Sequence, residues 1–278
     1  MARKHNIIIV GAGLFGSIAA TYARAQGHKV TVISEDRKYA ASKASGCVLA
    51  PSWLSSLDKA DIADAMAVLE SLYTVHDIEF QTNVLAKFKA KRVDPDAVLV
   101  KPDVVGAVIS VADGVVKYLD QDGNPGTLRG TVLVAAGIWS QELITQMPPI
   151  KGLYGCSLRI PGQLVVPRIS VYAPYRQAVG FQLNKREVWF GDGTALIAKT
   201  WDAEERDRLA KTTARAADMM GGPVVRAKVF CGARPYVEGH KAGYLEQISP
   251  KLWVSTGGSK NGTVLAALQA LRFEESLT

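Results

Sequence analysis

Three glycines near the N-terminus have the spacing of a phosphate-binding turn. Gly11, Gly13 and Gly16 form a Gly-x-Gly-x-x-Gly motif directly after the apolar run Ile7-Ile-Ile-Val10. In such a turn the first glycine permits a sharp bend, the second lets the backbone approach a pyrophosphate, and the third lets the next helix pack close to the strand. The helix N-terminus attracts an anionic phosphate. The motif therefore predicts a dinucleotide site formed by Gly11, Ala12, Gly13, Leu14, Phe15 and Gly16.

The elements around the turn agree with that prediction. Residues 14–25 have a helical pattern that ends at Gly27, and residues 29–33 read as a second strand. An acid usually ends this second strand and binds the ribose, but Ser34 holds the place here and Glu35 follows. The ribose contact is left open between Ser34 and Glu35. The alternative is a glycine-rich turn without a cofactor, and the motif alone does not separate FAD from NAD.

Composition limits the class of protein. The chain has 278 residues, enough for one large or two modest domains with a real core. No apolar run reaches the ~18 residues that a membrane span needs, so we expect no membrane partner. The three cysteines, Cys47, Cys156 and Cys231, are far apart and show neither metal spacing nor a disulfide framework. We therefore expect no metal, no disulfide and a reducing, cytoplasmic location.

The net charge of +7 is concentrated in two segments. Residues 151–200 contain seven basic residues and two acids, and residues 84–92 contain four basic residues and no acid. In a strand the lysines of the second segment share one face, which suits a polyanion. This predicts a nucleic-acid contact at Lys87, Lys89, Lys91 and Arg92. The same pattern also fits an edge strand that is protected by charge, so both interpretations stay open.

Later segments predict the rest of an α/β fold. Residues 131–136 read as a further strand of a parallel sheet, and residues 252–255 read as a last strand, followed by a glycine-rich loop and a helix over 263–273. That second strand, glycine loop and helix directs another helix N-terminus toward a ligand. Residues 55–80 read as a helix. Residues 151–200 contain short apolar runs broken by Pro and Gly, which favours an antiparallel sheet.

Several patches now form a recognisable set. They are the Gly11 motif, Ser42 to Gly46, Ala136-Gly-Ile-Trp-Ser140, Gly232-Ala-Arg-Pro235 and Thr256-Gly-Gly-Ser-Lys-Asn-Gly262. In this order they resemble the FAD-dependent amine oxidoreductases of the glycine oxidase, sarcosine oxidase and D-amino-acid oxidase family. The resemblance implies an α/β fold with a Rossmann-like FAD-binding domain and an inserted antiparallel-sheet substrate domain. The FAD-binding domain would comprise 1–50, 93–150 and 228–278, and the substrate domain 51–92 and 151–227.

The resemblance also implies a set of site residues. Beyond the glycine turn, FAD would contact Ser34, Glu35, Ser42, Lys43, Gly46, Ala136, Gly137, Trp139, Gly232, Gly258, Ser259, Lys260, Asn261 and Gly262. Arg234 would hold a substrate carboxylate, which a guanidinium group binds bidentately. The alternative for Arg234 is a structural pairing with a loop. Tyr236 and Lys260 would line the substrate side. The rings of Trp139, Trp189 and Trp253 are expected to belong mainly to the core.

The implied chemistry is oxidation of an amine beside a carboxylate. Hydride would pass from the carbon next to the amine to flavin N5, and the product would hydrolyse to an oxo acid such as glyoxylate and an amine. We assign no catalytic acid or base, because none of the four histidines lies in a matched segment. Positioning of a neutral amine is enough for this chemistry.

The substrate itself is predicted less directly. The family usually has a helix of several turns after the segment that corresponds to Val93-Asp94-Pro95, and this chain has no room for one. A trimmed scaffold and concentrated positive charge predict a glycine-like group carried on a nucleobase of DNA or RNA. The family offers two precedents, one acting on a modified tRNA uridine and one on glycinyl-thymine in phage DNA. The alternatives are an oxidase of a small amino acid such as glycine, sarcosine or a D-amino acid, and a non-catalytic protein that binds flavin and nucleic acid. The oligomeric state and the electron acceptor stay open.

Overall fold

The fold was analysed in a computed structural model. It describes residues 4–49, 57–82, 87–164, 169–171, 179–191, 196–197, 207, 209–214, 216–217 and 222–277. Within these ranges no helix is long and apolar enough to cross a membrane. The same ranges contain no cluster of three His, Cys, Asp or Glu side chains that could hold a metal ion.

The largest sheet has eight strands in the order β16-β17-β9-β1-β2-β6-β7-β8. Its parallel part consists of β17 (Leu252–Thr256), β9 (Thr131–Val134), β1 (Asn6–Val10), β2 (Lys29–Ser34) and β6 (Val104–Ala112). The antiparallel strands at its two sides are β16 (Tyr244–Ser249), β7 (Val115–Asp120) and β8 (Pro125–Arg129). The prediction that residues 131–136 add a strand to a parallel sheet is confirmed.

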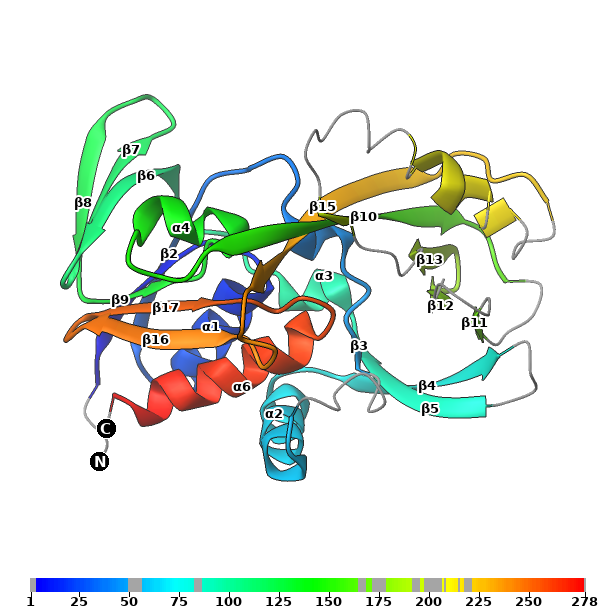
Figure 1. The fold of residues 1–278 in the computed structure, drawn as a ribbon, viewed down its shortest axis with the longest axis horizontal. Helices are drawn as coiled ribbons and strands as arrows, with labels where there is room; N and C mark the ends of the chain where they lie inside the picture. The colour runs from blue at the N-terminus through cyan, green and yellow to red at the C-terminus, as the bar shows by residue number, and fades with distance from the viewer. Residues whose placement is uncertain are drawn as a thin grey trace.

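Two helices pack together on one face of this sheet. They are α1 (Leu14–Ala25) and α6 (Gly262–Glu275), which lie side by side below the sheet in Figure 1. Ile18 and Ala20 of α1 and Ala267 of α6 are fully buried in the same core cluster. Both helices begin at the same edge of the sheet, after β1 and β17. The two glycine segments predicted to face one ligand are therefore neighbours.

The remaining strands form two smaller sheets. One contains β12 (Val179–Asn184), β13 (Glu187–Gly191), β10 (Ile150–Pro161), β14 (Leu196–Ile197) and β15 (Lys228–Val237). The other contains β11 (Ile169–Val171), β4 (Val75–Thr82), β5 (Lys87–Val93) and β3 (Val48–Leu49). Figure 1 shows β10 and β15 running from the large sheet to the far end of the molecule. The predicted α/β class with a separate, largely antiparallel part is confirmed.

The remaining described helices are one longer helix and four short ones. The longer helix is α2 (Lys59–Leu72), and the short ones are η1 (Ala41–Ala44), α3 (Pro95–Val98), η3 (Gly137–Trp139) and α4 (Ser140–Leu143). The helix predicted over 55–80 is only partly right. Asp58 caps α2 by accepting a hydrogen bond from the Asp61 N–H, and Tyr73 after its end is extended. Val75–Thr82 is a strand because it pairs along β5, and this tertiary pairing overrides the helical spacing.

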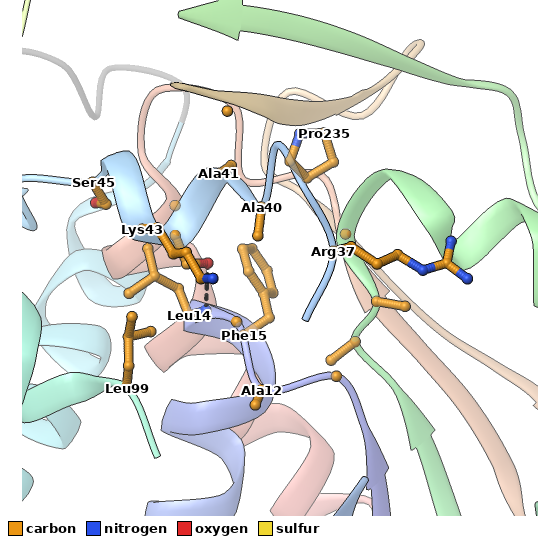
Figure 2. A pocket seen from close by; sticks show the side chains of 18 of the residues that line it. Ala12, Leu14, Phe15, Arg37, Ala40, Ala41, Lys43, Ser45, Leu99 and Pro235 are labelled. Atoms are coloured by element: carbon orange, nitrogen blue, oxygen red, sulfur yellow. Dashed lines mark hydrogen bonds between the residues drawn. The ribbon is translucent and has the colours of Figure 1, made fainter. Parts of the chain in front are cut away.

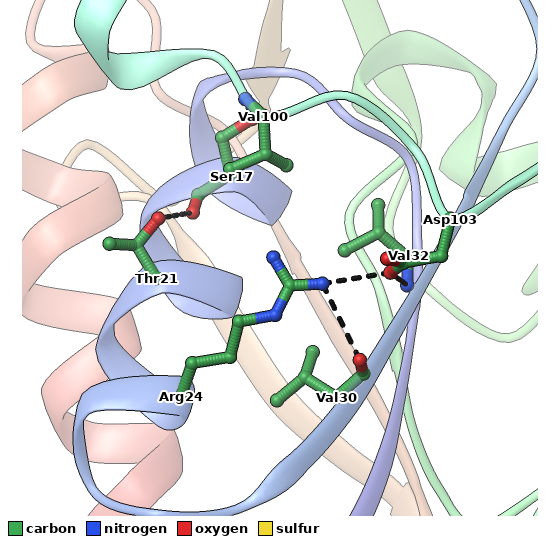
Figure 3. Close-up of polar contacts among 7 residues, drawn as sticks. All are labelled: Ser17, Thr21, Arg24, Val30, Val32, Val100 and Asp103. Carbon is green, nitrogen blue, oxygen red and sulfur yellow. Dashed lines mark hydrogen bonds and ion pairs between the residues drawn. The ribbon is translucent and has the colours of Figure 1, made fainter.

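Asp103 fixes the crossover between β5 and the large sheet. Its carboxylate accepts hydrogen bonds from the Val32 N–H at 2.7 Å and from Arg24 Nη2 at 2.8 Å (Figure 3). Nearby, Ser17 Oγ accepts a hydrogen bond from the Val100 N–H at 3.1 Å. These bonds hold the crossover against both α1 and β2. Because α1 and β2 frame the glycine turn, the crossover becomes a fixed wall beside it.

The cysteine prediction is wrong for two of the three residues. Cys156 and Cys231 stand directly opposite each other on β10 and β15 and form a disulfide, with their Cα atoms 4.1 Å apart. They are 75 residues apart in the sequence, so only the strand register brings them together. The expectation of a reducing compartment was based on the absence of a disulfide, so this structure no longer supports it. Cys47 is the third cysteine and is buried with a free thiol.

Candidate active site

A cavity of about 700 Å³ lies where the large sheet meets β10 and β15. Its walls include residues 10–15, 33–37, 40–48, 99–102, 135–139, 155–157, 232–235 and 258–260. Of the residues predicted to contact cofactor or substrate, all but Gly16, Asn261 and Tyr236 line this cavity. The structure therefore brings together segments that are spread over most of the chain.

The glycine turn has the geometry that a pyrophosphate needs. Gly11 has a φ of +109°, and a Cβ there would lie 2.5 Å from the Ala135 carbonyl oxygen. A Cβ on Gly16 would lie 1.8 Å from the Gly11 carbonyl oxygen, so only glycine allows this contact. The N-cap residue of α1 is Gly13, which has no side chain to cap the helix, and the first turn contains no acid. Its positive end therefore faces the cavity without a competing negative charge.

A loop and η1 cover the turn from the other side. Ser42 Oγ accepts a hydrogen bond from the Leu14 N–H at 2.8 Å, which ties η1 to the start of α1. Figure 2 shows Ala40 and Ala41 on the segment between Phe15 and Pro235. A Cβ on Gly232 of β15 would lie 2.6 Å from the Ala41 Cα, so this glycine lets the segment cross the strand.

The second glycine loop completes the same end of the cavity. A Cβ on Gly258 would lie 2.6 Å from the ring of Phe15, so the loop before α6 packs directly on the start of α1. Helix α6 also has no side-chain cap and no acid in its first turn. Lys260 is exposed at the cavity edge beside that helix end. Two helix N-termini and a lysine make this region favourable for negative charge.

The end of β2 contains a cluster of paired charges. Arg37 forms ion pairs with Glu35 and with Glu142, the latter at 2.8 Å, and its guanidinium lies 5.3 Å from the Trp139 ring centroid. In Figure 2 the Arg37 side chain extends away from the Ala40 segment, beside α4. Ser34 Oγ donates a hydrogen bond to the Glu35 carbonyl at 3.2 Å. Both Ser34 and Glu35 line the cavity, so the ribose contact stays a choice between them.

The opposite end of the cavity is formed by the second sheet. On β10 and β15, Leu153 pairs with Arg234, Gly155 with Gly232, and Ser157 with Phe230. Residues two apart on a strand and residues directly opposite share a face, so Arg234, the two glycines and Ser157 are on one face. Tyr236 shares it too, but does not line the cavity.

Trp189 forms a wall of the cavity that was not predicted. Its indole is 9% exposed and lies 2.4 Å from where a Cβ on Gly191 would be, and 3.0 Å from one on Gly46. Its ring stacks on Phe181, with centroids 5.1 Å apart and planes inclined by 23°. Trp189 is therefore buried, as expected for a core residue, and also faces the ligand space. Trp253 does pack against the core, at the ring of Phe273.

Groups for acid–base or nucleophilic catalysis are scarce among the described cavity residues. None of them is a histidine. The acids that line the cavity are bonded to cations: Glu35 and Glu142 to Arg37, and Asp36 to Lys43. Burial raises the pKa of the Cys47 thiol, so it stays protonated and is a poor nucleophile.

The lysine-rich strand β5 lies outside the cavity and is less cationic than its sequence suggests. In the register with β4, Lys91 stands opposite Asp77. Lys91 also forms an ion pair with Glu70 at 2.7 Å. The predicted contact at the side chain of Lys87 lies outside the part of the chain whose side chains are described.

Arg92 does not belong to a cationic surface at all. It is 8% exposed, donates a hydrogen bond to the Leu183 carbonyl at 3.1 Å, and lies over the ring of Phe181. Removal from water lowers the pKa of its guanidinium. Its predicted exposure to a phosphate backbone is therefore wrong, because β5 buries this side of the strand against the second sheet.

Comparison with known families identifies this arrangement. A family model described as "DAO: FAD dependent oxidoreductase" matches residues 6–93 and 96–272. The chain belongs to this DAO family. FAD is accordingly its cofactor, and the turn at Gly11 and the starts of α1 and α6, which contain no acid in their first turns, fit a dinucleotide. No curated protein sequence matches the chain.

Solved structures have the same fold at low sequence identity. Iminodiacetate oxidase from Chelativorans sp. BNC1 has a TM-score of 0.67 at 14% identity, covering 95% of this chain and 93% of that one. Glycine oxidase from Geobacillus kaustophilus has a TM-score of 0.67 at 16% identity, covering 99% and 95%. Fructosyl amine:oxygen oxidoreductase (Amadoriase I) from Aspergillus fumigatus has a TM-score of 0.60 at 15% identity, covering 100% and 87%. Each comparison spans nearly the whole DAO fold of this chain.

Proposed function

We propose that this DAO-family enzyme oxidises the carbon–nitrogen bond of an amine that stands beside a carboxylate. The products are an oxo acid, such as glyoxylate, and an amine. The observation that carries the proposal is the position of Arg234, which lines the same cavity as the glycine turn, on the second sheet and away from the pyrophosphate site. The structural neighbours named for iminodiacetate, glycine and fructosyl amines support an amine substrate.

The side chains of the cavity have separable tasks. Arg234 binds the carboxylate and thereby orients the neighbouring C–H bond. Trp189 closes the cavity wall and keeps water away from the reacting carbon. Lys260 and the start of α6 attract negative charge at the other wall. FAD, when bound, supplies the redox chemistry by accepting hydride from the substrate carbon.

Proton transfer does not require a side chain in this scheme. A substrate amine that enters the cavity without its extra proton leaves nothing for a base to remove before hydride transfer. This agrees with a cavity whose described acids are ion-paired with Arg37 or Lys43 and whose Cys47 thiol stays protonated. The expectation that positioning dominates over acid–base catalysis is thus compatible with the site.

A small-molecule substrate is favoured over a nucleobase in DNA or RNA. The prediction of a nucleic-acid substrate depended on a trimmed scaffold and on concentrated positive charge, and several of those charges are ion-paired or buried. Lys91 is paired with Glu70, Lys151 with Glu238, Arg159 with Asp96, and Arg92 is buried. We therefore propose an amino acid or N-substituted amino acid as substrate.

Substitution of Arg234 tests the proposal. In Arg234→Lys and Arg234→Ala, the Kd or KM for an amine with a carboxylate should rise about 10- to 100-fold, because a charge-assisted bidentate pair is lost. FAD content should be unchanged. Arg272→Ala, which removes an arginine that pairs with Asp61 outside the cavity, is the matched control. Equal affinity in wild type and both Arg234 variants would contradict the proposed carboxylate site.

A further inference from the structure

Ser157 is a buried polar residue without a hydrogen-bond partner for its hydroxyl. It is 2% exposed, and among the described residues no group bonds to its Oγ. It nevertheless lines the cavity. Burying an unsatisfied hydroxyl is unfavourable, so such a group usually has a partner in the functional state of the protein. The cavity is the place from which that partner can come.

The residues around Ser157 indicate which kind of ligand would bind there. The residue pairs with Phe230 on one side and with Gly191 on the other, and the Trp189 indole lies over Gly191. The wall next to the hydroxyl is thus aromatic and flat. On the same face, Gly155 and Gly232 pair with each other, and the backbone of Ala41 lies over Gly232. Ser157 and Arg234 both line the one cavity, so a ligand can reach both from the cavity side of this segment.

The distance between Arg234 and Ser157 is too long for the smallest substrates to contact both residues. Arg234 is opposite Leu153, which is four residues from Ser157, or roughly 13 Å along the strand. Glycine held by its carboxylate at Arg234 covers only part of that distance. A substituent on the nitrogen would continue the molecule toward Ser157.

We propose that Ser157 determines specificity by hydrogen bonding to a polar group on the nitrogen substituent of an N-substituted glycine. The inference extends the proposed function, because it takes Arg234 as the carboxylate site. The hydroxyl both donates and accepts, so it suits a hydroxyl, carbonyl or carboxylate on the substituent. Apolar parts of the substituent pack on Trp189. The preferred substrate is therefore longer than glycine or sarcosine.

Two pairs of probes test the role of Ser157. The first pair, (2-hydroxyethoxy)acetate and propoxyacetate, has an ether oxygen in place of the amine, so neither is oxidised and only binding is measured. The two probes differ only in a terminal hydroxyl or methyl group. They are titrated into the FAD-loaded protein, and binding is followed by the change in the flavin absorption spectrum. The second pair, N-(2-hydroxyethyl)glycine and N-propylglycine, gives the same comparison in kcat/KM.

The wild type should bind the hydroxyl probe about 3- to 10-fold more tightly than its methyl counterpart, and Ser157→Ala should lose this preference. Ser157→Ala should remain folded, because it removes a hydroxyl that is unsatisfied in the protein. Ser140→Ala is the matched control. Ser140 is also fully buried with no partner for its hydroxyl among the described residues, but it does not line the cavity. This control should keep the wild-type preference.

Three results would overturn the inference. One is an unchanged preference in Ser157→Ala. The second is a loss of FAD affinity in Ser157→Ala with the probe preference intact, which would assign the hydroxyl to the cofactor. The third is a wild type that binds neither ether while glycine reduces its flavin anaerobically. In all three cases the proposed function survives if Arg234→Lys still weakens binding of carboxylates. If no amine reduces the flavin and Arg234→Lys has no effect, the proposed function fails as well.

Discussion

Alanine substitutions at two glycines of the turn should have different effects, one on the stability of the apoprotein and the other on FAD binding. In Gly16→Ala the new Cβ would lie 1.8 Å from the Gly11 carbonyl oxygen, whereas real Cβ contacts are not shorter than 3.0 Å. Both atoms belong to the backbone framework, so α1 has to move by more than 1 Å relative to β1. Overpacking of this kind costs about 1–3 kcal/mol or more. The apoprotein itself should be destabilised.

Gly13→Ala meets a different neighbour. Its φ of −75° and ψ of −175° are accessible to alanine, and the closest atom is the Ser42 Oγ at 2.9 Å, which can rotate away only by losing its hydrogen bond from the Leu14 N–H. The free energy of unfolding of the apoprotein should therefore fall by no more than about 1 kcal/mol, the usual contribution of one hydrogen bond. The added methyl group stands where the backbone approaches the pyrophosphate. FAD affinity should fall at least about 10-fold, since one lost close contact of 1.4 kcal/mol has that effect.

The assay combines unfolding of the apoprotein with fluorescence titration by FAD. The expected pattern is a large loss of apoprotein stability for Gly16→Ala, and a small loss of stability with weak FAD binding for Gly13→Ala. Wild-type FAD affinity in Gly13→Ala would refute the placement of the pyrophosphate at this turn. Wild-type stability in apo Gly16→Ala would refute the packing argument.

Further predictions concern other contacts of the fold. The hydrogen bonds from Arg159 hold the pKa of Asp96 below its ordinary value of 3.8, so this pair stabilises the protein at higher pH and loses its effect as pH falls below about 4. The stability advantage of wild type over Asp96→Asn should be constant at neutral pH and vanish in acid urea titrations. Replacing Cys156 and Cys231 by serine should lower the free energy of unfolding by about 2–4 kcal/mol, because the bridge closes a long loop. Dithiothreitol should then no longer affect the melting temperature, and a continued effect would contradict the pairing. Trp189→Ala should lower the free energy of unfolding by about 3 kcal/mol, measured by thermal unfolding. Trp189→Phe can still stack on Phe181, so it should lower this free energy by less.

Local sequence patterns were sufficient to predict the part of the fold that surrounds the glycine turn. The run Ile7–Val10 is at most 3% exposed, and the glycine turn follows it at the edge of the sheet, as its spacing predicted. The same holds for the second glycine loop and α6. These features depend on neighbours within a few residues, so their signals are complete in the sequence.

Features that depend on strand register could not be predicted from the sequence. Strand β10 has glycines at 152 and 155, which weaken a strand pattern, and it becomes regular only because all ten residues of β15 pair with it. That pairing also joins Cys156 to Cys231 and places Ser157 in the cavity. The lysines of β5 looked unopposed for the same reason, since Asp77 comes opposite Lys91 only in the folded sheet. The glycines that border Trp189, Gly46 and Gly191, were the only sequence sign of its position.

Anaerobic reduction of the bound flavin tests the central claim most directly. The purified protein, loaded with FAD, is mixed without oxygen with iminodiacetate, glycine or N-(2-hydroxyethyl)glycine, and with the corresponding amines that lack a carboxylate. The account predicts loss of the oxidised flavin absorption with the carboxylate-bearing amines, slower in Arg234→Lys, and formation of an oxo acid. Reduction by amines without a carboxylate as fast as by those with one, or reduction by neither, would contradict it.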